Sequence, residues 1–446
     1  MFSIEEINNA INGTILYNNK KNIDTISINS NDIKNNALFI PILGEKHDGH
    51  EFILDAIKND CNAVLIASNH TQMDKLIKTC FDNNISAIEV GDTLQALQEL
   101  AHYNRIKNKD TKVIAITGSN GKTSTKDLIY DTLKYDYNVL KTEGNLNNHI
   151  GLPLTLLKLN KHDICILEMG MNHFGEIEKL SNIAEPDIAI ITNIGTAHIG
   201  ILGSKDNILK AKMEITSGLK ENGLLFINND DEYLNGVGLS SNYTTFKYGL
   251  TDSIKKFNKV GEYPINIALA YEISKVFNIK LNKFKKYLKL HKTPKMRMEK
   301  IKIKNNIIIN DCYNANYDSM KSGIENIIKN YGKKNYHLLL YLGDMLELGE
   351  WSPYYHKEIG KLINKNNIDV LYVSGNDVKY VLDEVSNSNI IKKQFKLSDN
   401  NSNIINDIIN QMNNKKKNIV YFKASRGIGL EKIVDELLLK LSDNDK

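Results

Sequence analysis

The sequence lacks the excess of one charge that a general nucleic-acid-binding surface requires. The formal net charge is only +4 over 446 residues, and no block of five like charges occurs. No apolar run approaches the roughly 20 residues needed to cross a bilayer. The first residues, Met1–Glu6, are acidic where a secretory signal is basic and then apolar. We therefore expect a cytoplasmic protein without stable membrane insertion.

Cysteine and arginine are both scarce. The four cysteines lie far apart and form no CxxC pair, so we expect reduced thiols and no zinc site; they are Cys61, Cys80, Cys165 and Cys312. Among 57 basic residues, only Arg105, Arg297 and Arg426 are arginine. Against this lysine background, an arginine marks a place where a planar, bidentate donor is needed.

The composition is that of a folded protein, with 41% hydrophobic and 25% charged residues. A disordered chain, a collagen-like chain and a small disulfide scaffold are excluded. Short runs of Ile, Val and Leu alternate with longer amphipathic stretches, which predicts βαβ units and an α/β fold with mostly parallel sheets. The predicted strands are Leu38–Pro41, Ala63–Ala67, Ala87–Val90, Lys112–Thr117, Asp163–Met169, Asp187–Asn193, Leu224–Asn228, Ile307–Asn310, His337–Leu342, Asp369–Ser374 and Asn418–Lys423.

The pattern divides into three predicted domains, 1–108, 109–294 and 295–446. The first ends in a predicted helix, Thr93–Arg105, and the second contains a glycine-rich loop. The polar stretch Lys289–Lys295, which contains Pro294, is predicted to link the second and third domains.

The glycine-rich loop Gly118–Ser124 lies between the predicted strand Lys112–Thr117 and a helical run from Thr125. Backbone N–H groups of such a loop approach phosphate oxygens, and the helix start adds positive potential. Lys122 can reach the outer phosphates and Thr123 can ligate Mg²⁺. Ile116 stands where the usual motif has its first glycine, so the loop is a shortened variant. The alternative is a glycine turn followed by a surface lysine.

Two further polar residues follow predicted strands, where ligands meet open α/β sheets. Glu168 ends one strand, and carboxylates there commonly hold Mg²⁺. His198 follows another, although a lone histidine is usually structural. Lys210–Glu214 is predicted to begin a helix, and by sequence alone its charges fit a solvated helix face.

Several motifs together resemble the Mur ligases over almost the whole chain. They are Thr117-Gly-Ser-Asn-Gly-Lys-Thr123, Gly144-Asn-Leu-Asn-Asn-His-Ile-Gly-Leu-Pro153, Glu168-Met-Gly-Met-Asn172, Thr192-Asn-Ile-Gly195 with His198, and Lys212-Met-Glu214. Three blocks resemble the branch that adds D-alanyl-D-alanine to a UDP-N-acetylmuramoyl-tripeptide; they are Asp311-Cys-Tyr-Asn-Ala-Asn316, Asp318-Ser-Met320 and Leu342-Gly-Asp-Met-Leu-Glu-Leu-Gly349.

The resemblance implies the fold of each domain and an ATP-dependent reaction. The three domains would be a uridine-nucleotide domain, a P-loop-type ATPase domain and a Rossmann-like ligase domain. ATP would phosphorylate the C-terminal carboxylate of the tripeptide, and the dipeptide amine would then displace phosphate. Lys122 would contact the β and γ phosphates, Thr123 and Glu168 would hold one Mg²⁺, and His198 would hold a second with Lys212 as an N-carbamate, because an ammonium cannot ligate Mg²⁺.

The same resemblance implies three groups of binding residues. The nucleotide would contact Gly118, Ser119, Asn120, Gly121, Lys122, Thr123, Ser124, Asn266 and Arg297. The peptide and dipeptide would contact Asn145, Asn148, Asn314, Asn316, Asp318, Asp344, Lys423, Ser425 and Arg426. The uridine-nucleotide sugar would contact Ser30, Gly44, Lys46, Asp48 and Gly49.

The chain departs from the family pattern at a few places. Asn31 stands where arginine is usual, Tyr317 replaces a proline, Ala424 replaces a glycine, and the stretch from Gly249 to Gly261 is short. Two other functions therefore stay open beside the ligase: an NTPase or phosphotransferase without ligation, and a non-catalytic binder of the sugar nucleotide. A monomer is expected, and the third residue of the acceptor peptide is left open.

Overall fold

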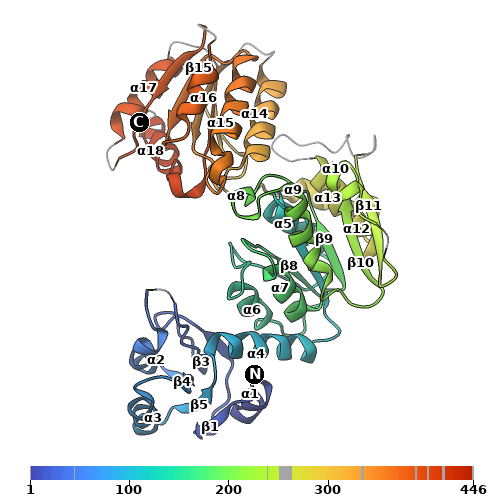
Figure 1. Cartoon of the computed structure of the whole chain (residues 1–446), viewed down its shortest axis with the longest axis vertical. Coiled ribbons are helices and arrows are strands. Elements are labelled where there is room, and N and C mark those ends of the chain that lie inside the picture. Colours follow the sequence, from blue (N-terminus) through green and yellow to red (C-terminus); the bar gives the residue numbers. More distant parts are fainter. Residues whose placement is uncertain are drawn as a thin grey trace.

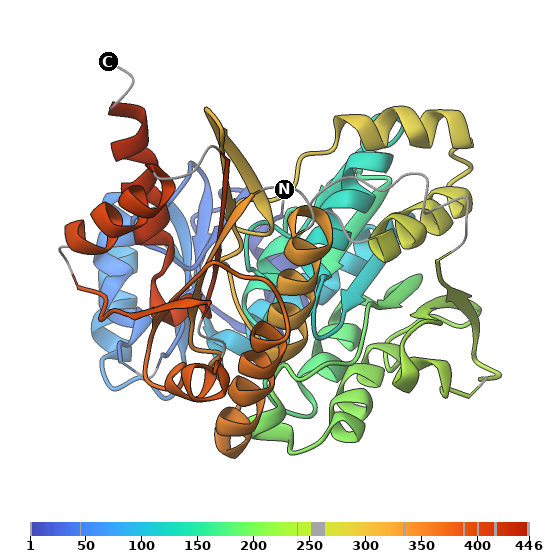
Figure 2. The ribbon, with the colours of Figure 1, turned by 90° about the horizontal axis from the view of Figure 1, so that it is seen from above.

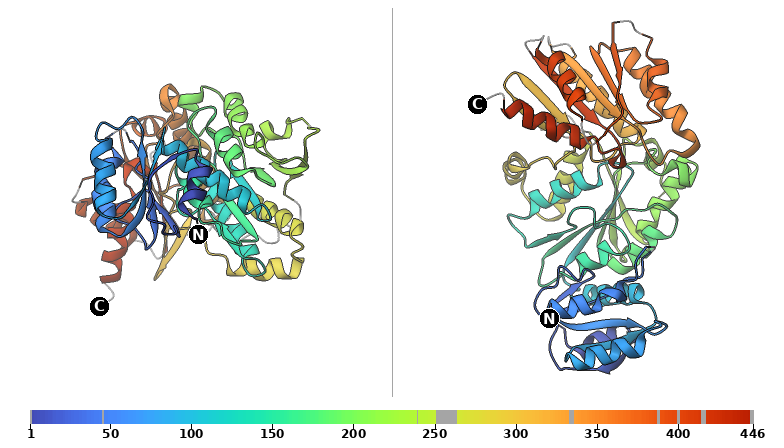
Figure 3. Two further views of the ribbon diagram at one scale, coloured as in Figure 1. Left: turned by 90° about the horizontal axis from the view of Figure 1, so that it is seen from below. Right: turned by 90° about the vertical axis from the view of Figure 1, so that its left-hand side faces the viewer.

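The chain forms three α/β units stacked along one axis, with the N-terminal unit at the bottom of Figure 1 and the C-terminal unit at the top. The computed structural model describes residues 2–44, 46–238, 240–250, 264–332, 336–386, 389–398, 401–413 and 417–443. Figure 3 (right) shows the same stack from the side, and Figure 2 looks along its long axis. Each unit has one sheet with a buried core, and the α/β class with mostly parallel strands is confirmed.

The N-terminal unit contains a five-stranded sheet in the order β1-β5-β4-β3-β2, with only the β1–β5 pair antiparallel. Its strands are β1 (Thr14–Tyr17), β2 (Thr25–Ser27), β3 (Ala37–Phe39), β4 (Cys61–Ala67) and β5 (Ser86–Val90). Its helices are α1 (Ile4–Ala10), η1 (Gly49–Phe52), α2 (Ile53–Lys58), α3 (Met73–Asp82) and α4 (Thr93–Lys107).

Helix α4 lies between the N-terminal and middle units (Figure 1). It packs on β4 on one side and on α6 and α7 on the other. Its buried Arg105 donates from Nε to the carbonyl of Ala184 at 2.9 Å, and Asn104 Nδ2 donates to the carbonyl of Leu156 at 2.8 Å. Buried polar side chains therefore fasten the two units together.

The middle unit contains a parallel six-stranded sheet in the order β11-β10-β9-β6-β8-β7. Its strands are β6 (Lys112–Thr117), β7 (Val139–Lys141), β8 (Ile164–Glu168), β9 (Ile188–Ile191), β10 (Gly223–Asn228) and β11 (Tyr243–Tyr248). Its helices are α5 (Lys122–Leu133), α6 (Gly151–Leu156), α7 (Glu176–Ala184), α8 (Ile199–Leu202), α9 (Lys205–Met213), η2 (Glu214–Thr216), α10 (Glu232–Asn235), α12 (Pro264–Val276) and α13 (Leu281–Leu290).

The C-terminal unit contains a six-stranded sheet in the order β12-β13-β17-β14-β15-β16, with only the β12–β13 pair antiparallel. Its strands are β12 (Glu299–Ile303), β13 (Asn306–Asn310), β14 (His337–Gly343), β15 (Val370–Ser374), β16 (Ile391–Gln394) and β17 (Asn418–Lys423). Its helices are α14 (Tyr317–Tyr331), η3 (Gly349–Trp351), α15 (Ser352–Asn364), α16 (Lys379–Glu384), α17 (Ser402–Asn413), η4 (Arg426–Ile428) and α18 (Glu431–Asp443).

All eleven predicted strands are present, but two other predictions need correction. Lys210–Glu214 does not begin a helix, because Ser204 caps α9 six residues earlier and Lys212 lies in its last turn. The predicted linker Lys289–Lys295 overlaps the end of α13, so the connection begins at His291. The short stretch from Gly249 to Gly261 lies, from residue 251 onward, outside the described residues.

The four cysteines are all buried and none forms a disulfide. Within the described part of the chain, every helix is too short or too polar to span a bilayer.

Candidate active site

The loop after β6 has the backbone shape that phosphate binding needs. Gly118 and Gly121 have φ values of +145° and +81°, a region that residues with side chains rarely adopt. A Cβ on Gly118 would lie only 1.9 Å from Thr192 Oγ1. Lys122 begins α5, and its Nζ donates to the carbonyl of Gly118 at 2.8 Å. Removal from solvent lowers the pKa of Lys122, although nearby Glu168 opposes this shift.

Glu168 lies at the end of β8, next to β6, with its side chain buried. Thr123 Oγ1 donates to Glu168 Oε2 at 2.8 Å, and Asn147 Nδ2 donates to Oε1 at 2.8 Å. Lys126 Nζ, also buried, lies 3.7 Å from Oε2. A carboxylate beside a hydroxyl is the oxygen donor set that suits Mg²⁺.

Lys126 is not among the predicted site residues. Lys126 lies one turn after Lys122 on α5, so helical spacing was the signal that could have found it. Asn147 lies between the predicted Asn145 and Asn148, and the sequence alone does not say which of the three amides faces Glu168.

Two further predicted residues, His198 and Lys212, have very different surroundings. His198 precedes α8 with a φ of +63°, and its Nδ1 lies 3.1 Å from Glu347 Oε2, an ion-pair distance without hydrogen-bond geometry. The nearby imidazole of His198 lowers the pKa of Glu347. The side chain of Lys212 is 2% exposed and, among the described residues, forms no ion pair with a carboxylate. Burial and the charge of Lys122 lower the pKa of Lys212 well below its usual value, which favours the neutral amine.

The C-terminal unit contacts the phosphate loop directly. Arg297 Nη2 donates to Thr123 Oγ1 at 2.9 Å, and its guanidinium lies 3.9 Å from the ring centre of Tyr313. Asn316 Nδ2 donates to Asn120 Oδ1 at 2.8 Å. Asp318 Oδ2 accepts a hydrogen bond from Thr196 Oγ1 at 2.8 Å. Side chains from both units therefore enclose one site.

A cavity of about 680 Å³ lies between the middle and C-terminal units. That volume is in the range of small-molecule sites. Sixteen predicted residues line it: Ser119, Asn120, Gly121, Lys122, Thr123, Ser124, Asn145, Asn148, Glu168, His198, Asn266, Arg297, Asn314, Asn316, Asp318 and Lys423. Lys423 also pairs with buried Asp311 at 2.7 Å.

Gly118 and Lys212 do not line the cavity, and three predicted residues of the C-terminal unit lie outside it as well. The Asp344 carboxylate accepts three backbone N–H groups, at 2.7–2.9 Å, which come from Asn376, Asp377 and Val378. Ser425 Oγ bridges the backbone of Ala315 and Leu346, and Arg426 Nη1 lies 3.2 Å from Glu431 Oε1. The structure thus gives these side chains contacts within their own unit.

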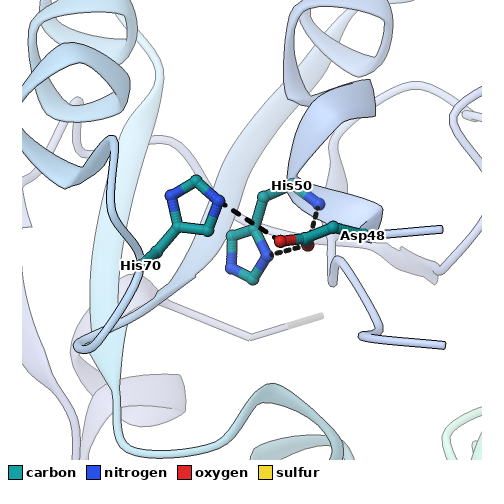
Figure 4. Close-up of side chains that lie close together, drawn as sticks. All are labelled: Asp48, His50 and His70. Atoms are coloured by element: carbon teal, nitrogen blue, oxygen red, sulfur yellow. Dashed lines mark hydrogen bonds and ion pairs between the residues drawn. The ribbon is translucent and has the colours of Figure 1, made fainter. Parts of the chain in front are cut away.

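The predicted sugar-nucleotide residues Ser30, Gly44, Lys46, Asp48 and Gly49 all lie in the N-terminal unit, away from this cavity. Asp48 meets two histidines there (Figure 4). Its Oδ1 accepts from the N and Nδ1 of His50 at 2.9 and 2.6 Å, and its Oδ2 lies 3.3 Å from His70 Nε2.

These three side chains bring potential ligand atoms within 4.8 Å of one another. However, His50 Nε2 accepts a hydrogen bond from the backbone N–H of Ala67 at 3.1 Å. Nε2 is then unprotonated, so Nδ1 carries the ring proton and donates it to Asp48. With both nitrogens in use, His50 does not fit a metal, and the cluster instead orders the start of η1.

Known sequence families match the chain in three consecutive regions. The family described as "Mur ligase family, catalytic domain" matches residues 22–105, "Mur ligase middle domain" matches 116–304, and "Mur ligase, glutamate ligase domain" matches 296–426.

Two similar proteins carry the same name. The chain is 37% identical over 442 residues, 93% of each chain, to the UDP-N-acetylmuramoyl-tripeptide–D-alanyl-D-alanine ligase of Bacillus subtilis. It is 30% identical over 378 residues to the ligase of that name from Escherichia coli, covering 78% of this chain and 80% of that one.

Two solved structures are also similar. Crystal structure I of MurF from Acinetobacter baumannii has a TM-score of 0.85 at 25% identity and 98% coverage of both chains. MurF from Thermotoga maritima in complex with ADP has a TM-score of 0.78 at 26% identity, covering 94% of this chain and 98% of that one.

Proposed function

The chain belongs to the Mur ligase family, and we propose that it joins D-alanyl-D-alanine to a UDP-N-acetylmuramoyl-tripeptide with conversion of ATP to ADP and phosphate. The product is the pentapeptide precursor of peptidoglycan. One observation carries this proposal: a single cavity is lined by the phosphate loop, by Glu168 and by the C-terminal residues Arg297, Asn316 and Asp318. Reactants held by separate units meet there, as a two-substrate ligation requires.

The phosphate loop would hold the ATP phosphates. Backbone N–H groups of Ser119–Ser124 would face the phosphate oxygens, and Lys122 would neutralise charge on the β and γ groups. Asn266 lies beside the loop, with its Nδ2 3.6 Å from where a Cβ of Gly121 would be, and would contact the adenine. Arg297, bonded to Thr123, would reach the transferred phosphate from the opposite side.

Thr123 and Glu168 would hold one Mg²⁺, and His198 and an N-carbamate of Lys212 would hold another. The amine of Lys212, which is buried and pairs with no carboxylate among the described residues, supports this assignment, because only a neutral amine adds to carbon dioxide. Bound Mg²⁺ would supply positive charge against the phosphate oxygens.

The reaction has two balanced steps. An oxygen of the tripeptide carboxylate attacks the γ phosphorus and forms a new P–O bond. The bond between the γ phosphorus and the β–γ bridging oxygen breaks, and ADP leaves with that oxygen. The dipeptide amine then attacks the acyl carbon, loses a proton, and releases inorganic phosphate as the amide forms. Asn145, Asn148, Asn314, Asn316 and Asp318 line the cavity where these groups would be held.

The N-terminal unit would hold the uridine end through Ser30, Gly44, Lys46 and Gly49. Asp48 would act indirectly there, because both of its carboxylate oxygens contact His50 or His70. The proposal includes three domains with boundaries near residues 108 and 294, a monomeric state and a cytoplasmic location. Asp344, Ser425 and Arg426 would support the cavity rather than line it.

The test is a product assay with ATP, D-alanyl-D-alanine and two tripeptides side by side, one with diaminopimelate and one with lysine as third residue. We expect phosphate release to require both the sugar nucleotide and the dipeptide, and the preferred tripeptide to identify the acceptor. Rapid ATP turnover with neither substrate would favour an NTPase, and binding of the sugar nucleotide without turnover would favour a non-catalytic binder.

A further inference from the structure

The middle and C-terminal units make a close backbone contact next to His198. Gly200 N, in α8, donates to the carbonyl of Glu347 at 3.2 Å. A Cβ on Gly200 would lie 2.6 Å from Gly349 N and 2.8 Å from Glu347 O. Main chain therefore packs on main chain here, and the positions of His198 and Glu347 relative to each other depend on how the two units dock.

The backbone is unusual on both sides of this contact. His198 has a φ of +63° and Glu347 a φ of +65°, although neither is glycine. A left-handed backbone is costly for a residue with a side chain, and it persists where the surrounding structure imposes it. Both residues are therefore held in place by their surroundings before any ligand arrives.

The two side chains face each other across the contact. His198 Nδ1 is buried and lies 3.1 Å from Glu347 Oε2, and among the described residues it forms no hydrogen bond. Both residues line the cavity. Histidines that ligate metals commonly donate their second ring N–H to a carboxylate, which fixes the tautomer and the ring orientation. A small rotation of Glu347 would bring its carboxylate into that role.

We propose that Glu347 is a positioning residue for the cation site that contains His198, and that docking of the C-terminal unit completes this site. The inference rests on the proposed function, in which His198 is a cation ligand. Glu347 acts through His198: it leaves Nε2 as the ligating nitrogen and adds a negative charge nearby. The second cation then binds tightly only when the unit that contributes Asn316 and Asp318 to the cavity is docked.

The test titrates Mn²⁺ into the ADP-loaded protein and follows free Mn²⁺ by electron paramagnetic resonance. The site that contains His198 is identified by its loss in His198→Ala. We expect Glu347→Gln to weaken Mn²⁺ binding at that site about tenfold, as loss of an outer partner typically does. Glu350→Gln is the matched control, an exposed glutamate three residues later in η3, and should bind Mn²⁺ like the parent.

A second variant separates this role from simple destabilisation. Gly200→Ala touches neither side chain but forces the two backbones apart, so it should also weaken Mn²⁺ binding, with circular dichroism unchanged. Both changes act through one contact, so their effects should not add. The double variant should bind Mn²⁺ as tightly as whichever single variant binds it more weakly.

An unchanged Mn²⁺ affinity in Glu347→Gln overturns the inference, whatever Gly200→Ala does. Failure of the parent to form the pentapeptide product overturns the proposed function instead, and the Mn²⁺ titration still decides the role of Glu347.

Discussion

Replacement of Gly118 by alanine should damage the phosphate loop for two separable reasons. The added Cβ would lie 1.9 Å from Thr192 Oγ1 and 3.1 Å from Thr192 N. Thr192 cannot move aside easily, because its Oγ1 donates to the carbonyl of Asn120 at 2.6 Å and its β-branched side chain is stiff. In addition, the φ of +145° at Gly118 is unfavourable for alanine.

The two effects are of similar size. An alanine forced into this glycine-only region of the backbone map costs about 1–3 kcal/mol. Overpacking of a tight site typically costs about 1–3 kcal/mol. The loop can relieve this strain by moving away from its phosphate-binding shape. A combined cost of about 3 kcal/mol would then appear as about a hundredfold weaker ADP binding.

Isothermal titration calorimetry with ADP and thermal unfolding would measure both consequences. Thr192→Ala in the same chain removes the 1.9 Å clash with Oγ1 but keeps the 3.1 Å contacts to Cβ and N and the backbone cost, so the double variant should recover less than half of the lost free energy. Gly175→Ala is the control, since Gly175 has a φ of +80° and nothing within 4 Å of its Cβ position; it should lose a little stability and no ADP affinity. If Gly118→Ala binds ADP and unfolds like the parent, the reasoning about this loop is refuted.

Three other substitutions test separate parts of the structure. Asp344→Ala leaves three backbone N–H groups, one of them buried, without their carboxylate, so we expect about 1–3 kcal/mol lower stability by denaturant unfolding. ADP affinity at temperatures where the variant stays folded should be unchanged, and a selective loss of substrate affinity instead would contradict the structural role. Arg297→Lys removes the planar guanidinium that stacks on Tyr313 and donates to Thr123, so we expect kcat/KM to fall about 10-fold or more with little change in Tm. Kinetics like those of the parent would show that the guanidinium is dispensable. The bond from Lys283 lowers the pKa of Asp136, so its stabilising effect is present above the pKa of the unfolded chain and is lost as pH falls through the folded-state pKa. Asp136→Asn should therefore flatten the acid side of a stability–pH curve below about pH 5, by less than about 1 kcal/mol for such an exposed pair, and an unchanged acid limb would count against this.

The interior of each sheet was predictable from sequence, whereas the edges were not. The strands that went unpredicted are all edge strands: β1, β2, β7, β11, β12 and β16. Edge strands are covered on fewer sides, so they carry no continuous apolar run; in β16 three of four residues are exposed. The helix around Lys212 was misplaced because the cap at Ser204 is a weaker signal than the charges that follow it.

The site residues that directly follow a predicted strand were predictable from the sequence. Lys122, Thr123 and Glu168 meet because adjacent parallel strands end at the same edge. Within one motif, however, sequence could not say that Asp344 turns toward the β15–α16 loop while Glu347 faces His198. Likewise, Lys212 reads as a solvated charge until the packing of α9 buries it. The chemical roles of these residues stay predictions.

Helix α4 fixes the spacing between the N-terminal and middle units. Arg105 of α4 is buried and hydrogen-bonded to the last turn of α7, so it holds the N-terminal unit against the middle unit. Under the proposed function, the residues that would hold the uridine end and the phosphate loop then lie at a fixed distance from each other. This fixed spacing would select acceptors by length. A stem peptide one residue too short would not bring its carboxylate to the γ phosphate, even with its uridine end bound.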